Sequence, residues 1–447
     1  MKSLYLALSL SLTPLAAPAL MPAPAMAQEQ PAAMTEAERQ EVVEAIASQL
    51  LGNYVFPETA EKMAKALRDK LASGGYASFT NPMQFSEQLT TDLRAISHDG
   101  HLRTIFSPEQ VGQMRARTER PADGPPQGYL DQLRRTNNGF RDVRILDGNV
   151  AYLNLTNFHD PGIAGARETA IAAMNYVSNA DALIIDLRKN GGGSPAMIQL
   201  IMSYLMGPEP VHLNTFYWRP TDSYSETWTH AEVEGKRRPD MDVYVLTSFF
   251  TFSAAEEFSY NMRNLKRGTL VGEVTGGGAH PGGPQPVTDR FLVWTPSGRA
   301  INPITKTNWE GTGVQPHFKT DADDALDKAY MMALEKLATE REGPQGDYYR
   351  WHLQSAQAKA NPVSVNAATL ASYVGTYGPR TLTLEDGVLH YQREGRPVHR
   401  LTPLSDDTFM LDGLENIRLQ LVKEDGRVTA LRGLYDNGRT DETKRDS

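Results

Sequence analysis

The sequence predicts an α/β fold, with an N-terminal helical subdomain before the α/β core and a small antiparallel β domain after it. Three observations support this prediction. Apolar residues recur at helical spacing between 35 and 96, continuous apolar strands alternate with helices from about 144 to 342, and short alternating segments separated by turns follow residue 365. The chain has 447 residues, enough for two or three domains of roughly 100–200 residues each.

The first 27 residues have the pattern of a secretory signal peptide. Lys2 is followed by an apolar run from Leu4 to Leu12 and then by Ala/Pro-rich sequence that ends in Ala25-Met26-Ala27. A positive start, a short apolar run and a small-residue cleavage site are typical of such leaders. Prolines interrupt the run before it reaches the ~20 apolar residues that a membrane span requires. We therefore expect a periplasmic or secreted protein whose mature chain has no membrane span.

Composition excludes several classes of function. The net charge is −9, and the longest basic run is Lys236-Arg237-Arg238, so we expect neither nucleic acid nor an anionic membrane as a partner. The chain has no cysteine. This excludes a cysteine nucleophile, a thiolate metal site, a structural disulfide and a lipid-anchored cysteine.

The expected helical subdomain covers 28–120 and contains three helices. The first begins at the capping box Thr35–Glu38, the second near Pro57 and the third near Asn81-Pro82. The third helix leads into Ser97-His98-Asp99-Gly100-His101.

The segment 121–143 begins with Pro- and Gly-rich sequence and is expected to be a linker. The α/β core is expected over 144–342, closed by a helix from about 323 to 341. Its strands are predicted at Val150–Leu155, Ala182–Leu187, Val243–Leu246 and Leu270-Val271.

A linker helix is expected within 343–364, before the small β domain at 365–447. The tripeptides Glu385-Asp386-Gly387 and Glu424-Asp425-Gly426 stand between apolar-alternating runs and are typical of hairpin turns.

Candidate chemistry concentrates in two segments that follow predicted strands. Ser253 lies between a buried strand and a helix, where a hydroxyl meets the edge of the sheet and the next amide, that of Ala254, points toward a developing oxyanion. Ser253 with Glu256 three residues later equally fits a capping box. The run Gly191-Gly192-Gly193 allows close backbone approach, either as an oxyanion hole or as a tight turn, and it lacks the spacing of a nucleotide-binding loop.

Two further segments offer a base and a carboxylate. His98 and His101 lie in a turn after a helix, and either a general base, a metal ligand pair or a plain surface turn fits that position, although no third-ligand pattern accompanies them. Glu310 lies in a Gly/Pro-rich loop, where it either orients a histidine or substrate or is an ordinary loop acid.

The order of these motifs resembles a known family over about 35–335. The motifs are Asn53-Tyr54-Val55-Phe56, Asp99-Gly100-His101, Asp186-Leu187-Arg188-x-Asn190-Gly191-Gly192, Thr251-x-Ser253-Ala254-Ala255-Glu256, Val271-Gly272-x-x-Thr275 and Gly313-Val314-x-Pro316. Together they are similar to the C-terminal-processing serine peptidases, which include the tricorn protease core. The branch similar to interphotoreceptor retinoid-binding protein is the nearest. The resemblance implies a crotonase-like ββα peptidase core without a PDZ domain, because only about 40 residues separate His101 from the first core strand.

The resemblance also implies roles for individual residues. Ser253 matches the nucleophile, His101 and Glu310 match the base and the acid of the tricorn-like branch, and the amides of Gly191, Gly192 and Ala254 match the oxyanion hole. In the processing branch a lysine 25 residues after the nucleophile is the base, but Gly278 stands there in this chain. Gly100 stands where the tricorn-type site has a serine before its histidine.

The resemblance therefore implies a serine peptidase that acts on peptides or proteins without a cofactor or metal. Two alternatives remain on the same fold. One is a binder of apolar ligands in which Ser253 is only a helix cap, and the other is a hydrolase of esters or other acyl compounds. The tail after 365 is similar to small β domains appended to some bacterial serine hydrolases.

Overall fold

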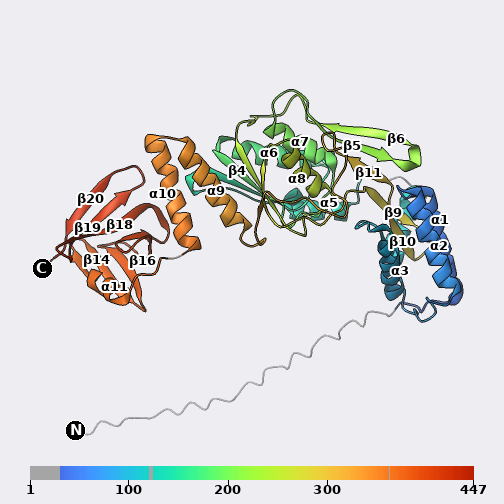
Figure 1. Ribbon diagram of the computed structural model, residues 1–447, viewed down its shortest axis with the longest axis horizontal. Coiled ribbons are helices and arrows are strands. Elements are labelled where there is room, and N and C mark those ends of the chain that lie inside the picture. The colour runs from blue at the N-terminus through green and yellow to red at the C-terminus, as the bar shows by residue number, and fades with distance from the viewer. Residues whose placement is uncertain (1–30, 120–123, 362, 447) are drawn as a thin grey trace, which may run out of the picture.

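The computed structural model describes residues 31–119, 124–361 and 363–446. The expected leader, 1–27, lies outside these described residues. Figure 1 shows three parts in a row: N-terminal helices with a small sheet, a central α/β core, and a C-terminal β domain. None of the helices within the described ranges has the length and apolar character needed to cross a membrane.

The N-terminal helices form where the capping signals predict them. They are α1 (Glu36–Asn53), α2 (Pro57–Ala72) and α3 (Pro82–Ser97). The hydroxyl of Thr35 accepts from the N–H of Glu38 at 3.1 Å and starts α1, and the Asn81 side chain caps α3 in the same way.

A small sheet from distant parts of the chain completes this subdomain. β1 (Arg103–Phe106) pairs with β10 (Phe291–Pro296), which pairs with β9 (Gly282–Pro286), all antiparallel. Phe291 and Val293 of β10 are buried among the apolar residues of the three helices. The expected helical subdomain is therefore completed by two strands, β9 and β10, that follow Ser253 in the sequence.

The segment 121–143 is more ordered than the linker that its composition predicts. α4 (Pro108–Glu119) precedes it, α5 (Gln127–Arg135) lies within it, and β2 (Phe140–Leu146) begins in it. β2 pairs antiparallel with β3 and forms one edge of the central sheet. The linker prediction is wrong for this part, because β2 is stabilised by a ladder to β3 rather than by its own apolar content.

The central sheet has six strands in the order β12-β8-β7-β4-β3-β2. All neighbours except β2 and β3 are parallel, so most strands end at the same edge. The other strands are β3 (Val150–Leu155), β4 (Ala182–Asp186), β7 (Asp242–Thr247), β8 (Thr269–Gly272) and β12 (Phe318–Lys319).

Helices cover both faces of this sheet. Alternate strand residues such as Ile185 and Val245 pack with α6 (Ala166–Tyr176), α7 (Pro195–Leu205) and α8 (Ala254–Asn264). The intervening residues pack with α9 (Ala325–Glu340) and with Tyr349 of α10 on the opposite face. Burial on both sides explains why the strands are continuously apolar.

A second small sheet connects the core to the N-terminal helices. It consists of β6 (Ser223–Trp228), β5 (His212–Trp218) and β11 (Gly298–Ile301). Arg219, just after β5, donates to the backbone carbonyls of Leu50, Leu51 and Tyr54 at the end of α1. These bonds hold the end of α1, and with it Tyr54, against the core.

The C-terminal part begins with α10 (Gly343–Ala360), followed by α11 (Ala367–Tyr373). Eight antiparallel strands then pair in sequence order, with hairpin turns at both predicted tripeptides. The strands are β13 (Gly375–Tyr377), β14 (Arg380–Glu385), β15 (Val388–Arg393), β16 (Val398–Pro403), β17 (Thr408–Leu411), β18 (Leu414–Glu424), β19 (Arg427–Tyr435) and β20 (Thr440–Lys444). The guanidinium of Arg418 lies 3.7 Å from the centre of the Trp351 ring and connects this domain to α10.

Candidate active site

The candidate site forms where the central parallel strands end. β7 lies between β4 and β8, and each of the three is followed by one of the motifs. Ser253 follows β7, Gly191-Gly192-Gly193 follows β4, and the loop Thr275–Gly278 follows β8. Since parallel strands end at one edge, these three segments meet there.

Ser253 has a strained backbone. Its φ is 57° and its ψ is −121°, whereas the N-cap residues Thr35 and Asn81 have φ of −87° and −86°. A positive φ is uncommon for a residue with a side chain, and with this ψ it lies outside the left-handed helical region in which such residues are usually found. The backbone N–H of Ser253 does donate to Glu256 at 2.9 Å, as in a capping box, but the conformation differs from that of an ordinary cap.

Glu256 connects the Ser253 segment to the loop after β8. Its carboxylate is fully buried and accepts from the N–H groups of Gly277 and Gly278, at 2.6 and 2.8 Å, and from the Thr275 hydroxyl, as well as from Ser253. Burial raises the pKa of Glu256 to about 7, against the opposing effect of these donors. Glu256, which the sequence predicts only as a helix-capping residue, therefore holds the Ser253 segment and the loop after β8 together.

The glycine loop lies directly against Ser253. A Cβ at Gly192, where φ is 107°, would lie 2.8 Å from the Ser253 Cβ and 3.0 Å from the Ala254 nitrogen. The buried Asn190 holds this loop: its side-chain oxygen accepts from the Gly192 N–H at 2.9 Å, and its backbone oxygen accepts from the Phe252 N–H at 3.0 Å. Within the described ranges, the N–H groups of Gly191 and Ala254 have no partner and remain available to a ligand.

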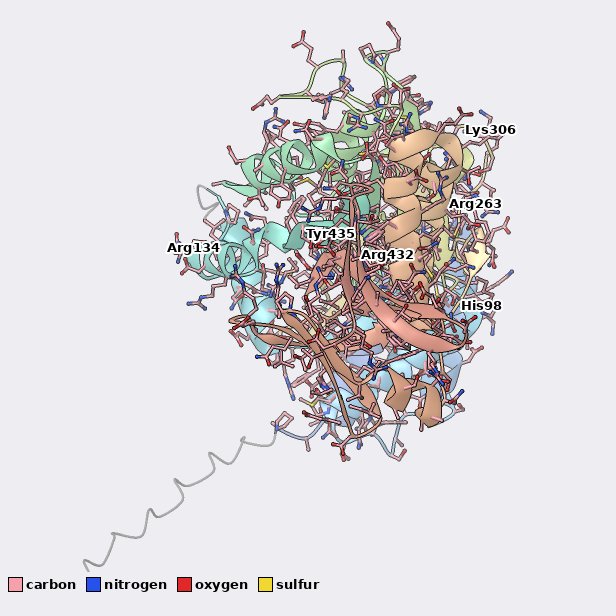
Figure 2. All side chains as sticks on the ribbon, turned by 90° about the vertical axis from the view of Figure 1, so that its left-hand side faces the viewer. His98, Arg134, Arg263, Lys306, Arg432 and Tyr435 are labelled. Carbon is pink, nitrogen blue, oxygen red and sulfur yellow. The ribbon has the colours of Figure 1, made fainter. Side chains whose placement is uncertain are left out.

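His101 lies beside the residue that precedes Ser253. Its ring centre is 4.6 Å from that of Phe252, and the side chain is 6% exposed. Its Nδ1 is buried without a partner, and no hydrogen bond joins it to Ser253 among the residues the structure describes. Burial lowers the pKa of His101 to about 4, against the opposing charge of Asp99, so the imidazole is neutral at pH 7. His98 is exposed and is labelled at the edge of the molecule in Figure 2. Its backbone ends α3 in a left-handed conformation.

Gly278 marks the place of the lysine found in the processing branch. A Cβ there would lie 2.2 Å from the Phe252 Cζ and 2.8 Å from the His101 Cε1. The two rings therefore fill the space that any side chain at this position would need.

Glu310 bonds to the loop of His101, and within the described ranges no hydrogen bond joins its carboxylate to the imidazole. One carboxylate oxygen accepts from the Gly100 N–H at 3.4 Å and the other from the Ala279 N–H at 2.5 Å. Burial and the charge of Asp99 raise the pKa of Glu310, while His280 lowers it. Glu310 therefore holds two loops together at the site.

His280 is a part of this site that lies outside every motif, whereas Asp99 and Tyr54 stand within motifs but have no role assigned by them. The Nδ1 of His280 lies 2.8 Å from Asp99 Oδ2 and 3.4 Å from Glu310 Oε2, and the Tyr54 hydroxyl donates to Asp99 at 3.2 Å. Potential ligand atoms of Asp99, His280 and Glu310 lie within 4.8 Å of one another, a spacing that a metal ion also accepts. Their mutual contacts and the backbone donors already pair these atoms, so we describe the group as a hydrogen-bonded cluster.

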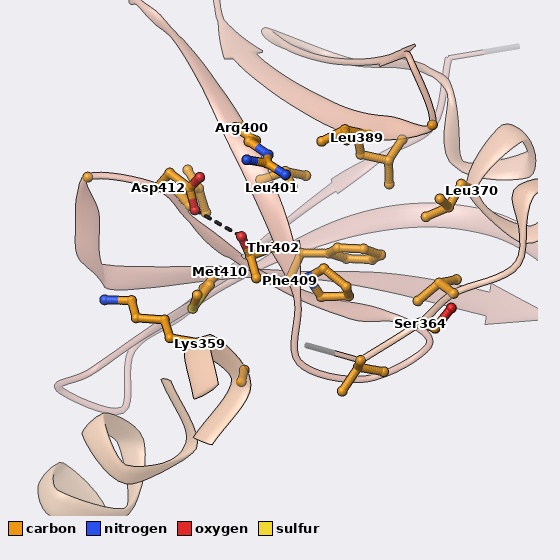
Figure 3. A pocket seen from close by; sticks show the side chains of 18 of the residues that line it. Lys359, Ser364, Leu370, Leu389, Arg400, Leu401, Thr402, Phe409, Met410 and Asp412 are labelled. Atoms are coloured by element: carbon orange, nitrogen blue, oxygen red, sulfur yellow. Dashed lines mark hydrogen bonds between the residues drawn. The ribbon is translucent and has the colours of Figure 1, made fainter. Parts of the chain in front are cut away.

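A sizeable cavity lies in the C-terminal domain, away from these residues. It has a volume of about 650 Å3 and an apolar floor in the C-terminal domain that includes Leu370, Leu389 and Phe409 (Figure 3). None of the candidate-site segments at the edge of the central sheet lines it. The volume of a cavity therefore does not locate the candidate active site, which lies at the edge of the central sheet.

Comparisons with known proteins agree with the motif order. Residues 149–320 match peptidase family S41, and residues 23–135 match the N-terminal domain of peptidase S41 in eukaryotic IRBP. The two matches together cover more than half of the chain.

A curated relative and several solved structures are also similar. The tail-specific protease of Haemophilus influenzae is 24% identical over 134 residues, which are 30% of this chain and 18% of that protein. The chain thus spans less than one fifth of that relative's length. The photosystem II D1 C-terminal processing protease is 15% identical, with a TM-score of 0.42 over 65% of this chain and 94% of that one. The tricorn protease is 13% identical, with a TM-score of 0.40 over 72% of this chain and 37% of that one. On the two matched regions, the chain belongs to peptidase family S41, whose members are serine-type peptidases.

Proposed function

We propose that this chain is an exported serine peptidase in which Ser253 is the nucleophile and His101 the general base. The supporting observation is that a serine in strained backbone geometry lies against a glycine loop, while the residue before it, Phe252, packs against a buried, neutral histidine. A helix cap has no need of that conformation or of unpaired amides beside it.

The proposed reaction proceeds through an acyl-enzyme. His101 removes the hydroxyl proton of Ser253 as its oxygen attacks the scissile carbonyl, and the imidazolium then gives that proton to the leaving amine. Water attacks the resulting ester with His101 again as base, which releases the second product and restores Ser253. A rotation of the Ser253 side chain toward His101 in the substrate complex would complete the proton path, because catalytic hydrogen bonds often tighten only then.

The free N–H groups of Gly191 and Ala254 are the proposed hydrogen-bond donors to the oxyanion. Gly192, the third predicted member, gives its N–H to Asn190 and contributes by its close approach to Ser253. One donor of this kind contributes about 3 kcal/mol to transition-state stability. Glu310 acts on His101 indirectly, by fixing the Gly100 backbone.

A digestion experiment tests the proposal. The mature protein and its Ser253→Ala and His101→Ala variants are incubated with a mixed peptide library, and new termini are read by mass spectrometry. We expect cleavage by the wild type and no turnover by either variant, with His98→Asn, an exposed histidine of the same turn, retaining activity. Wild-type rates in Ser253→Ala would refute the proposal. No cleavage by any form would favour an apolar-ligand binder or an acyl-ester hydrolase, which extraction of bound lipids and ester substrates would then separate.

Export is a separate part of the proposal, based on the leader pattern of residues 1–27. We expect the N-terminus of the protein recovered from the periplasm or medium to be Gln28. Retention of the full leader in a cytoplasmic fraction would refute export without affecting the proposed chemistry.

A further inference from the structure

His280 has no role in the mechanism above, yet it lies at the centre of the buried charges of the site. It is 6% exposed, and its Nδ1 faces the carboxylates of Asp99 and Glu310 at once. The ring of Phe56 packs edge-on against it, with centres 5.2 Å apart. Two buried carboxylates next to each other repel unless a donor or a cation lies between them, and His280 occupies that position.

Both partners of His280 hold the loop that carries His101, and Glu310 also holds Ala279. Asp99 accepts from the backbone N–H of His101 at 3.0 Å, and Glu310 accepts from Gly100 and Ala279. The loops around residues 100, 279 and 310 are therefore joined by Glu310, and the imidazole of His280 contacts both carboxylates where they meet. Without it, the two carboxylates would face each other with only the Tyr54 hydroxyl and backbone donors to hold them.

We propose that His280 is a positioning residue of the peptidase site, which holds Asp99 and Glu310 together and thereby places His101 against Ser253. This inference rests on the proposed function, because it assigns His280 a part in the same reaction. His280 touches none of the reacting atoms, so its effect is expected on the rate of the chemical step rather than on substrate binding.

The position of His280 also affects the charge of the base. The charged and titratable groups around His101 are Asp99, which favours the imidazolium, and His280, Arg103 and Arg94, which disfavour it. Loss of His280 removes one of the opposing groups. The pKa of His101 in the free enzyme should then rise, and the acidic limb of the kcat/KM profile should move to higher pH, because the base works only when it is neutral.

The test compares His280→Ala and His280→Asn with wild type and with His98→Asn as the matched control. The Asn side-chain nitrogen takes nearly the place of Nδ1, so this variant keeps a donor between the two carboxylates. We expect kcat to fall about 100-fold in His280→Ala, the loss typical of a base misplaced by about 1 Å, with KM within threefold. In His280→Asn we expect kcat to recover to within tenfold of wild type, while the acidic limb stays shifted to higher pH.

The outcomes separate the inference from the proposed function. If wild type cleaves peptides in a Ser253-dependent manner but His280→Ala keeps its kcat, the inference is wrong and the proposed function stands. Equal losses of kcat in His280→Ala and His280→Asn, with no shift in the acidic limb of the kcat/KM profile, would also overturn the inference, because they indicate a merely structural effect. Circular dichroism checks folding, and if His280→Ala does not fold, the kcat and pH profile of His280→Asn decide. Failure of wild type itself to cleave or to react with a fluorophosphonate probe would instead refute the proposed function.

Discussion

Substitution of Gly278 by alanine should disable the proposed base without unfolding the protein. The added Cβ would lie 2.2 and 2.6 Å from two carbons of the Phe252 ring and 2.8 Å from the His101 Cε1. Carbon atoms in contact normally lie about 3.5–4.0 Å apart, so at least one ring has to move by about 1 Å. Phe252 has little room to retreat, because the backbones of Gly100 and Gly276 also lie against it.

The size of the effect follows from that displacement. A shift of about 1 Å at a catalytic group costs about 100-fold in rate, equivalent to about 3 kcal/mol of transition-state stabilisation. Overpacking costs typically about 1–3 kcal/mol of folding stability, which a protein of this size can tolerate. Gly278 does not have a positive φ, so the substitution adds no backbone strain to this steric effect.

The assay measures kcat/KM on a peptide identified in the digestion, and the rate of labelling by a fluorophosphonate probe. Gly283→Ala is the matched control, because a Cβ there meets nothing within 4 Å. We expect Gly278→Ala to lose about 100-fold in both rates, Gly283→Ala to equal wild type, and added Phe252→Leu to restore part of the loss by removing ring atoms. Wild-type kcat/KM in Gly278→Ala would refute the argument that His101 in this position is the base.

Two pairs of neighbouring residues give further predictions. Burial raises the pKa of Glu257 from 4.5 to about 8, so the folded chain binds this proton more tightly than the unfolded chain, and stability falls as pH rises between those values. At pH 7 this proton linkage lowers the free energy of unfolding by about 3 kcal/mol. Glu257→Gln should therefore raise the melting temperature at pH 7–8 but not near pH 4. A difference in melting temperature between variant and wild type that is the same at both pH values would contradict this. Glu256→Gln should instead lower both stability and kcat, because each carboxylate oxygen accepts from two donors and an amide group would face two of them. Gly192→Ala should lose at least 100-fold in kcat/KM by pushing its Cβ into Ser253, whereas Gly191→Ala, whose Cβ meets nothing within 4 Å, should stay within a few fold of wild type; similar rates in the two variants would argue against the glycine-loop geometry.

Local patterns were sufficient to predict most helices and the central strands. The capping residues Thr35 and Asn81 mark real helix starts, and the apolar runs in β4 and β7 are buried on both faces as expected. The pairing of β1 with β10 could not be predicted in this way, because the two strands lie far apart in the sequence and each is short. β2 was missed for a similar reason, since its stability comes from its ladder to β3.

The residues of the candidate site likewise fall into those that a local motif predicts and those that only the fold brings together. Ser253 and the glycine loop were found because each follows an apolar strand in a recognisable motif. His280 lies in Gly/Pro-rich sequence without periodicity, and its partners Asp99 and Glu310 belong to other segments, so only their spatial arrangement reveals its position. Glu256 was recognised only as a capping residue, because its bonds to Gly277 and Gly278 depend on the loop after β8.

The bond between Gly100 and Glu310 joins residues 210 positions apart, and β1 completes its sheet only with β10. During synthesis, the segment that carries His101 is therefore made long before the strand and the carboxylate that fix it. Such long-range closure forms late in folding. A chain that has not yet extended past Glu310 would lack these contacts, so the topology makes assembly of the candidate site depend on nearly the whole core.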